Sequence, residues 1–200
     1  MDHRIACVGD SLTYGFLVEN REQNHYPAQL GRLLGEGFKV NNFGENGHTA
    51  QKEADLPYWH HPKFQASCSF APNTVILMLG TNDAKWQNWQ GAEVFIKDYR
   101  ALVQHYQALP SQPQVFLMTP PKMFAVPGVV SNVQPAVVEV IAQLVRDLGV
   151  DLGLPVIDLN RATQGRPELF PEDGIHTSAA GASFIAGLVR EGLRGFSAKV

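Results

Sequence analysis

The 200-residue sequence predicts an α/β domain, a three-layer α/β/α sandwich built on about five parallel strands. Short apolar runs alternate along the chain with longer segments whose apolar residues recur at helical spacing. One run, residues 74–79 (TVILML), is continuously apolar apart from its first residue, as expected of a strand that is covered on both faces. Neither an internal repeat nor a linker divides the chain, so we expect residues 1–200 to form a single domain.

Five short apolar runs are the expected strands. In chain order they are residues 5–8, 38–43, 74–79, 115–118 and 156–157. The first run stops at Gly9 and the fourth is stopped by Pro120, two residue types that interrupt strands. Since helical segments separate these runs, we expect parallel pairing through right-handed crossovers.

Four segments show the helical spacing. They are residues 27–34, 92–109, 135–148 and the stretch that follows Ser178. Pro135 suits the first turn of a helix, and Gly149 suits the position just after a helix end. Ser178 is the expected N-cap of the last helix.

The composition disfavours several classes of partner. Charged residues make up 18% of the chain, the formal net charge is −3, and no basic run is present, so we expect no binding to nucleic acid. No stretch approaches the roughly 20 apolar residues of a membrane-spanning helix. The N-terminus shows no signal-peptide pattern, so we expect a cytoplasmic protein, or a periplasmic or secreted one if a leader was removed. Cys7 and Cys68 match neither a disulfide framework nor a zinc-ligand spacing.

Polar motifs follow four of the expected elements. Gly9-Asp10-Ser11 follows the first strand, and Asn42-Phe43-Gly44-Glu45-Asn46-Gly47 covers the end of the second. Gly80-Thr81-Asn82-Asp83 follows the third, and Asp173-Gly174-Ile175-His176 comes after the fifth, before the last helix. In open parallel sheets the ligand site lies beyond the carboxyl ends of the strands, so we expect these motifs to meet there.

Acyl transfer requires a nucleophile, an adjacent base and a group that orients the base. Ser11 follows a strand, where its hydroxyl would be presented at the open edge, and Gly9 would allow a tight turn before it. Asp173 and His176 lie three residues apart with Gly174 between them, so a turn could fold the carboxylate back onto the ring. Each motif alone also occurs in ordinary turns; their joint occurrence favours a catalytic site.

The transition state also requires hydrogen-bond donors for the developing oxyanion. The candidates are the backbone N–H groups of Ser11 and Gly44 and the side-chain amide of Asn82. Glycine at position 44 would let a substrate approach the backbone closely. Asp10 and Asp83 are expected to fix their turns through hydrogen bonds to nearby backbone N–H groups.

With these four motifs in order, the chain resembles the SGNH hydrolases, also called the GDSL esterase/lipase superfamily, over nearly its whole length. It is most similar to bacterial sialate O-acetylesterase-like and lysophospholipase-like members. The resemblance implies a flavodoxin-like fold and no metal or organic cofactor. It implies Ser11 as nucleophile, His176 as base and Asp173 as its orienting partner, with Ser11, Gly44 and Asn82 forming the oxyanion hole.

The resemblance predicts hydrolysis of a short acyl ester, such as an O-acetyl group on a carbohydrate, through an acyl-enzyme intermediate. The alternatives are a lysophospholipase or thioesterase acting on longer chains, or an acyltransferase. A flavodoxin-like binding module without catalysis is less favoured, because the first loop lacks the Ser/Thr-Gly-rich character of a flavin phosphate site.

Four further residues are candidates for substrate binding. They are Trp59, Trp86, Trp89 and His48. Indole rings can stack on sugars, although each tryptophan could equally cover a loop. His48 could equally cap a turn. Residues 126–130 could line an apolar wall of the pocket.

Overall fold

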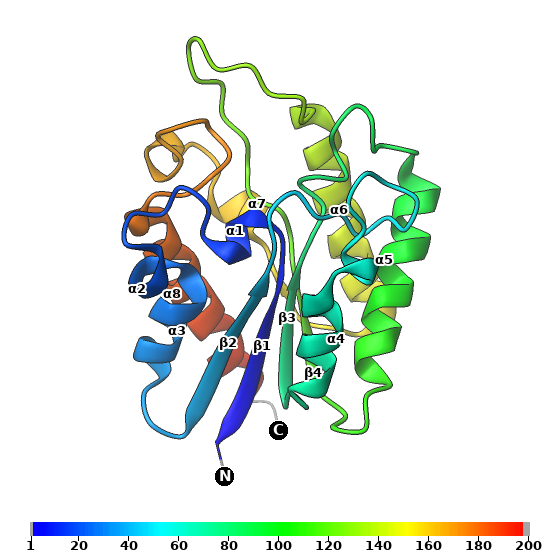
Figure 1. The fold of residues 1–200 in the computed structure, drawn as a ribbon, viewed down its shortest axis with the longest axis vertical. Coiled ribbons are helices and arrows are strands. Elements are labelled where there is room, and N and C mark those ends of the chain that lie inside the picture. Colours follow the sequence, from blue (N-terminus) through cyan, green and yellow to red (C-terminus); the bar gives the residue numbers. More distant parts are fainter. Residues whose placement is uncertain (1, 198–200) are drawn as a thin grey trace.

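The structure, a computed structural model, describes residues 2–197. Its centre is a five-stranded parallel sheet of order β2-β1-β3-β4-β5 (Figure 1). The strands are β1 (His3–Gly9), β2 (Phe38–Gly44), β3 (Thr74–Met78), β4 (Gln114–Met118) and β5 (Val156–Ile157). This confirms the predicted sheet and the positions of all five strands.

Helices cover both faces of the sheet, as Figure 1 shows. One face carries α3 (Tyr26–Leu34) and α8 (Ala179–Ser197), and the other carries α4 (Pro62–Ser69), α5 (Ala92–Gln107) and α6 (Pro135–Leu152). The remaining elements are short: α1 (Ser11–Tyr14), α2 (Arg21–Asn24), η1 (Tyr58–His60), α7 (Leu159–Ala162) and η2 (Pro167–Leu169). The predicted three-layer α/β/α sandwich is therefore confirmed.

Successive side chains of a strand point to opposite faces of the sheet, so the strands contribute to two separate hydrophobic cores. In β1, Ile5 and Cys7 pack toward α3 and α8, whereas Ala6 and Val8 pack toward α4, α5 and α6. All five residues of β3 are buried, which explains its unbroken apolar run. Fully burying one such aliphatic side chain contributes about 1.5–3 kcal/mol, so the central strands carry much of the fold's stability.

The carboxyl ends of the strands meet at one edge of the sheet. Gly9 at the end of β1 lies opposite Gly44 of β2 and Met78 of β3. The motifs that follow these strands are thereby brought together, at the upper edge in Figure 1, where α1 also lies.

The helices largely match the prediction. Ser178 accepts the N–H of Gly181 at 3.1 Å with its hydroxyl, which confirms it as the cap of α8. No helix was expected at α4, because this segment is short and contributes only Phe64 and Cys68 as an apolar pair at helical spacing. No helix within residues 2–197 is long and apolar enough to cross a membrane.

The predicted end of α6 at Gly149 is wrong. The helix continues to Leu152 and ends at Gly153, which adopts the left-handed conformation with φ 63°. Gly149 is instead a packing residue, because a Cβ there would overlap a side-chain methyl group of Val156. It lets the helix approach β5 closely.

We therefore expect Gly149→Ala to lower the free energy of unfolding by ~1–3 kcal/mol through overpacking. Gly187→Ala in α8 is the matched control: no atom lies within 4 Å of its Cβ position, so higher helix propensity should stabilise by ~0.5–1 kcal/mol. Urea denaturation of both variants measures the difference. If the free energy of unfolding changed by the same amount and in the same direction in both variants, this account of Gly149 would be contradicted.

Candidate active site

Ser11, His176 and Asp173 form a continuous hydrogen-bonded chain. Ser11 Oγ lies 2.8 Å from His176 Nε2, and His176 Nδ1 lies 2.6 Å from Asp173 Oδ2. Because an ionised carboxylate only accepts hydrogen bonds, Nδ1 carries the proton and Nε2 is left to accept the Ser11 hydroxyl. Ser11 and His176 are 165 positions apart in sequence, so only the fold brings them together.

Asp173 is held in place by a turn of its own segment. Its Oδ1 accepts the N–H groups of Ile175 at 2.9 Å and His176 at 2.8 Å. Burial alone would raise the pKa of Asp173, but these hydrogen bonds and the one from the His176 ring outweigh it and lower the pKa. The carboxylate is therefore kept ionised beside the imidazole.

Glycine is required within this turn. Gly174 has φ +75°, and a Cβ there would overlap the carbonyl oxygen of Phe124. Gly174 in turn accepts the N–H of Phe124 at 2.9 Å. The turn that aligns Asp173 with His176 is thereby anchored to the long segment after β4.

Ser11 is the first residue of the single helical turn α1. Asp10 is the N-cap, and its Oδ1 accepts the N–H of Leu12 at 3.0 Å, as predicted. Gly9 does not adopt a positive φ, but it does allow the tight turn, because α1 packs back over it and a Cβ on Gly9 would overlap the Thr13 hydroxyl. A Cβ there would lie 2.5 Å from the carbonyl oxygen of Met78, so Gly9 is required by close packing.

A cavity of about 240 Å³ opens beside Ser11. It is lined by Ser11, Phe16, Asn46, Gly47, Thr81, Asn82, Lys85, Ser131, Asn132, Val133, Ile175 and His176. Of the predicted site residues, Ser11, Asn82 and His176 face this space, and Asp173 lies behind His176. Apolar and polar groups are mixed in the lining, and Lys85 is its one residue with a permanently charged side chain.

Asn82 is oriented toward the cavity by a backbone contact. Its Nδ2 donates one hydrogen to the carbonyl oxygen of His48 at 3.1 Å, which leaves the second amide hydrogen for a ligand. The Ser11 N–H is at the start of a helical turn, where no intrahelical acceptor exists. Of the three predicted oxyanion donors, Ser11 and Asn82 therefore line the cavity, each with a donor hydrogen that no described residue uses.

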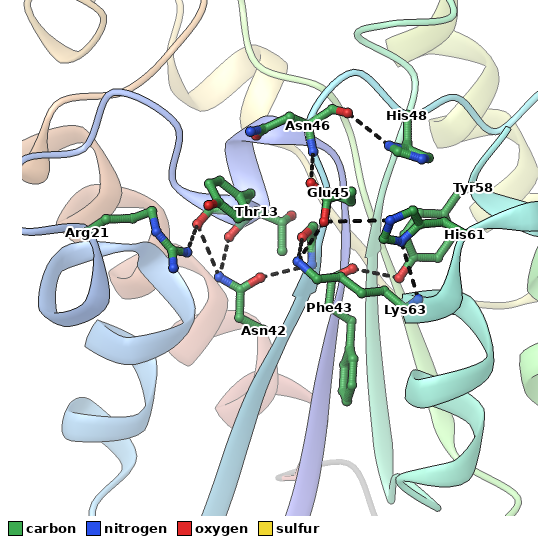
Figure 2. Close-up of polar contacts among 12 residues, drawn as sticks. Thr13, Arg21, Asn42, Phe43, Glu45, Asn46, His48, Tyr58, His61 and Lys63 are labelled. Carbon is green, nitrogen blue, oxygen red and sulfur yellow. Dashed lines mark hydrogen bonds and ion pairs between the residues drawn. The ribbon is translucent and has the colours of Figure 1, made fainter. Parts of the chain in front are cut away.

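Gly44 does not line the cavity. Its N–H donates to Asn42 Oδ1 at 2.9 Å, and Asn42 Nδ2 donates to the carbonyl oxygen of Thr13 at 2.8 Å (Figure 2). A Cβ on Gly44 would lie 2.6 Å from the carbonyl carbon of Thr13. The glycine is thus needed where α1 packs on β2, and its N–H is already bonded within the protein.

Gly47, three residues later, lines the cavity instead. Its φ is +80°, and the residues that the structure describes provide no acceptor for its N–H. Both glycines occur in the same motif, so the sequence contained Gly47 as an equal candidate. Only the packing of α1 distinguishes them.

An ion pair supports the loop that carries Gly47. Lys63 Nζ donates to the carbonyl oxygen of Gly44 at 2.5 Å and pairs with Glu45 at 3.0 Å, as Figure 2 shows. Burial raises the pKa of Glu45, but the Lys63 ammonium outweighs that effect and lowers it. Glu45 also accepts the N–H of Asn46 at 3.0 Å, so the loop is fixed from the side opposite the cavity.

None of the four candidate substrate-binding residues lines the cavity, and three of them have other contacts that account for their positions. Trp59 donates its Nε1–H to the carbonyl oxygen of Ala50 at 3.0 Å and covers the core. Trp89 packs near Phe95, with ring centroids 6.3 Å apart. The ring of His48 is buried, and its Nδ1 bonds the carbonyl oxygen of Asn46 at 2.9 Å. In all three cases the structural alternative holds.

Trp86 lies at the rim of the cavity. Its side chain is 71% exposed, and it directly follows Lys85, which lines the cavity. The Trp86 N–H donates to the carbonyl oxygen of Asn132, another lining residue, at 3.1 Å. An exposed indole is therefore held on a fixed backbone beside the cavity.

Residues 126–130 are divided between two environments. Val126 and Val129 line a second cavity of about 210 Å³ beside Asp173, whereas Val130 is 97% exposed. The second cavity shares Ser131 and Val133 with the first. The expected apolar wall thus borders the neighbouring cavity.

Two buried carboxyl groups lie beneath the site. Burial raises the pKa of Asp10 to about 7 and that of Asp83 to about 6, and the negative charge of Asp83 contributes to the raised pKa of Asp10. Asp83 was predicted to fix its own turn, but it accepts the N–H groups of Ala50 at 3.0 Å and Gln51 at 2.8 Å instead. It therefore joins the end of β3 to the loop after β2.

Among residues 2–197, no three His, Cys, Asp or Glu side chains are grouped closely enough to bind a metal ion. Cys7 is buried and Cys68 half-buried, and the two are not bonded to each other.

Comparison with known proteins defines the class. Residues 7–183 match the model of the GDSL-like lipase/acylhydrolase family. The chain therefore belongs to this family, which confirms the resemblance to the SGNH hydrolases and the predicted class, the carboxylic ester hydrolases.

The relatives include esterases of several kinds. The chain is 28% identical over 208 residues to an acetylxylan esterase of Xylanibacter ruminicola, covering 96% of this chain but 43% of that protein. It thus spans less than half the length of this relative. A carbohydrate acetylesterase family member from Sinorhizobium meliloti superposes with TM-score 0.74 at 22% identity, covering 97% and 98% of the two chains. An aryl esterase from M. smegmatis superposes with TM-score 0.75 at 19% identity, covering 96% and 98%. At these identities the two structures establish the fold alone.

The buried carboxyl Asp10 predicts a pH dependence of stability. An unfolded Asp titrates near 3.9 and folded Asp10 near 7, so the folded state binds more protons between these values. The free energy of unfolding should therefore fall as pH rises through this window. Asp10→Asn keeps an acceptor for the Leu12 N–H but cannot titrate. Between pH 5 and 8 the variant should therefore lose less free energy of unfolding than the wild type, by on the order of 2 kcal/mol.

Urea denaturation at the two pH values measures both losses. Asp83 acts in the same direction, so some pH dependence should remain in the variant. Glu53→Gln, at an exposed position, is the charge-matched control and should follow the wild type. Parallel losses in Asp10→Asn and wild type would show that Asp10 does not hold its proton in the folded state.

Proposed function

We propose that this chain is a serine ester hydrolase that removes a short acyl group, most simply O-acetyl from a carbohydrate, through an acyl-enzyme intermediate. The observation that carries the proposal is the hydrogen-bonded chain from Ser11 Oγ through His176 to Asp173, opening into the cavity. Nucleophile, base and orienting group are within hydrogen-bond reach, as acyl transfer requires.

In the first half-reaction, Ser11 Oγ attacks the ester carbonyl carbon while its proton passes to His176 Nε2. Asp173 keeps the other proton at Nδ1 and stabilises the imidazolium that forms. The C–O bond to the alcohol then breaks, and the alcohol oxygen takes the proton from Nε2. In the second half-reaction His176 Nε2 removes a proton from water, and the water oxygen attacks the acyl carbon. The bond from the acyl carbon to Ser11 Oγ then breaks as Oγ takes the proton from Nε2, which releases the acid.

The negative charge of the tetrahedral intermediate requires donors that are already oriented. We assign this role to the N–H groups of Ser11 and Gly47 and to the amide of Asn82. Gly47 replaces Gly44, because it lines the cavity and its N–H is not used by the described residues.

Three observations support a short acyl group on a carbohydrate. The cavity of about 240 Å³ is small for an ester that carries a long chain. The acetylxylan esterase and the carbohydrate acetylesterase family member are relatives named for acetylated carbohydrates. Trp86 at the rim offers an exposed aromatic face on which a sugar ring can stack.

Ser11→Ala should lower hydrolysis of para-nitrophenyl acetate by on the order of 10⁴-fold or more, because triad members act as a unit. Ser131→Ala, which removes another hydroxyl from the same cavity, should stay close to wild type. Wild type should prefer the acetyl ester to the octanoyl ester, because the cavity is small. Equal rates in Ser11→Ala and wild type would remove Ser11 as nucleophile, and a preference for octanoyl would favour the long-chain alternative.

Asn82→Ala should lower kcat by about 100–1,000-fold while KM changes little, because an oxyanion donor acts mainly in the transition state. Steady-state kinetics with para-nitrophenyl acetate separates the two constants. Thermal denaturation of the variant checks that the loop around His48 is intact. A near-normal kcat would exclude Asn82 from the oxyanion hole.

A further inference from the structure

Phe16 is held by the same short segment that carries Ser11. Its N–H donates to the carbonyl oxygen of Ser11 at 3.0 Å, across the left-handed Gly15 (φ 88°) that ends α1. The next residue, Leu17, also has a positive φ, 62°, which is unusual for a bulky side chain. This strained turn gives Phe16 a defined position relative to the nucleophile.

The Phe16 ring lies against the catalytic histidine. The ring centroids of Phe16 and His176 are 4.9 Å apart at an interplanar angle of 69°, an edge-to-face contact. Phe16 also lines the cavity and is 41% exposed, so part of its surface is available to a ligand. The ring therefore forms the cavity wall on the side of the base.

The chemistry decides which part of an ester would meet that wall. The alcohol oxygen must take its proton from His176 Nε2 when it leaves, so the alcohol part must lie beside the His176 ring. The carbonyl oxygen points to the donors of Ser11, Gly47 and Asn82. The acyl substituent takes the third direction from the carbonyl carbon, away from both.

From this placement we propose that Phe16 is the specificity-determining residue for the alcohol moiety, and that it favours esters of ring-shaped alcohols. The inference rests on the proposed ester hydrolysis. The C–H face of a pyranose, or the face of an aryl group, can pack against the exposed part of Phe16, whereas an ethyl group leaves most of it uncovered. Having no hydrogen-bonding group, Phe16 selects for a ring and not for a hydroxyl pattern.

The test varies the two halves of the ester separately. All acetates pass through the same acetyl-enzyme, so differences in kcat/KM among them report the alcohol moiety during acylation. In Phe16→Ala, kcat/KM for cyclohexyl acetate should fall about tenfold, and that for ethyl acetate by no more than about twofold. The ratio of ethyl butyrate to ethyl acetate should not change. Phe16→Tyr, which keeps the ring, should restore the preference.

Leu17→Ala is the matched control, because Leu17 is the adjacent exposed apolar residue and does not line the cavity. It should keep the wild-type preference for cyclohexyl over ethyl acetate. Equal losses on both acetates in Phe16→Ala would overturn the inference, since Phe16 would then act only through His176. A changed butyrate-to-acetate ratio would also overturn it, since Phe16 would line the acyl side.

Failure of the proposed function gives a different result. If wild type hydrolyses none of the acetates, or if the hydrolysis survives in Ser11→Ala, both the proposed function and the inference fall. If hydrolysis depends on Ser11 but the ring preference is independent of Phe16, only the inference falls.

Discussion

The close packing of α1 against the ends of β1 and β2 is the constraint on which the site depends. Neither Gly9 nor Gly44 leaves room for a Cβ, because the backbone and the Thr13 side chain occupy that space. Asn42 then bonds Gly44 and the carbonyl oxygen of Thr13 with a single side chain. One helical turn thereby packs closely on two neighbouring strands, and moving Ser11 away from this sheet edge would break the part-buried hydrogen bonds of Asn42.

The rest of the site is assembled around that fixed point from separate loops. His176 reaches Ser11 because Asp173 and Gly174 shape its turn, and Asn82 faces the cavity because the carbonyl oxygen of His48 holds its amide. Asp83 joins the third strand to the same loop that contains His48. The candidate catalytic groups are thus held by hydrogen bonds to neighbouring loops, and the loop after β2 is bonded to both Asn82 and Asp83.

Periodicity alone predicted the sheet and the long helices, because strands buried on both faces and amphipathic helices have distinct apolar patterns. The motif order predicted which loops meet. The sequence could not distinguish Gly44 from Gly47, since the choice depends on where α1 packs. It also misplaced the end of α6, because a glycine required by a neighbouring strand looks the same as one that ends a helix. The sequence could not distinguish the tryptophans either, because their surroundings, and not their identity, decide whether they cover a core or face a ligand.

The segment after β4 has two unequal parts. At Phe124 the backbone N–H donates to the carbonyl oxygen of Gly174, and the carbonyl oxygen of Phe124 leaves no room for a Cβ on Gly174, so this part belongs to the frame that aligns the histidine. A few residues later, Val130 is almost fully exposed. Substitutions or insertions near Val130 can therefore reshape the approach to the cavity while the catalytic geometry stays intact. Related chains can therefore differ in substrate through changes at the exposed tip of this segment, while its base at Phe124 is kept.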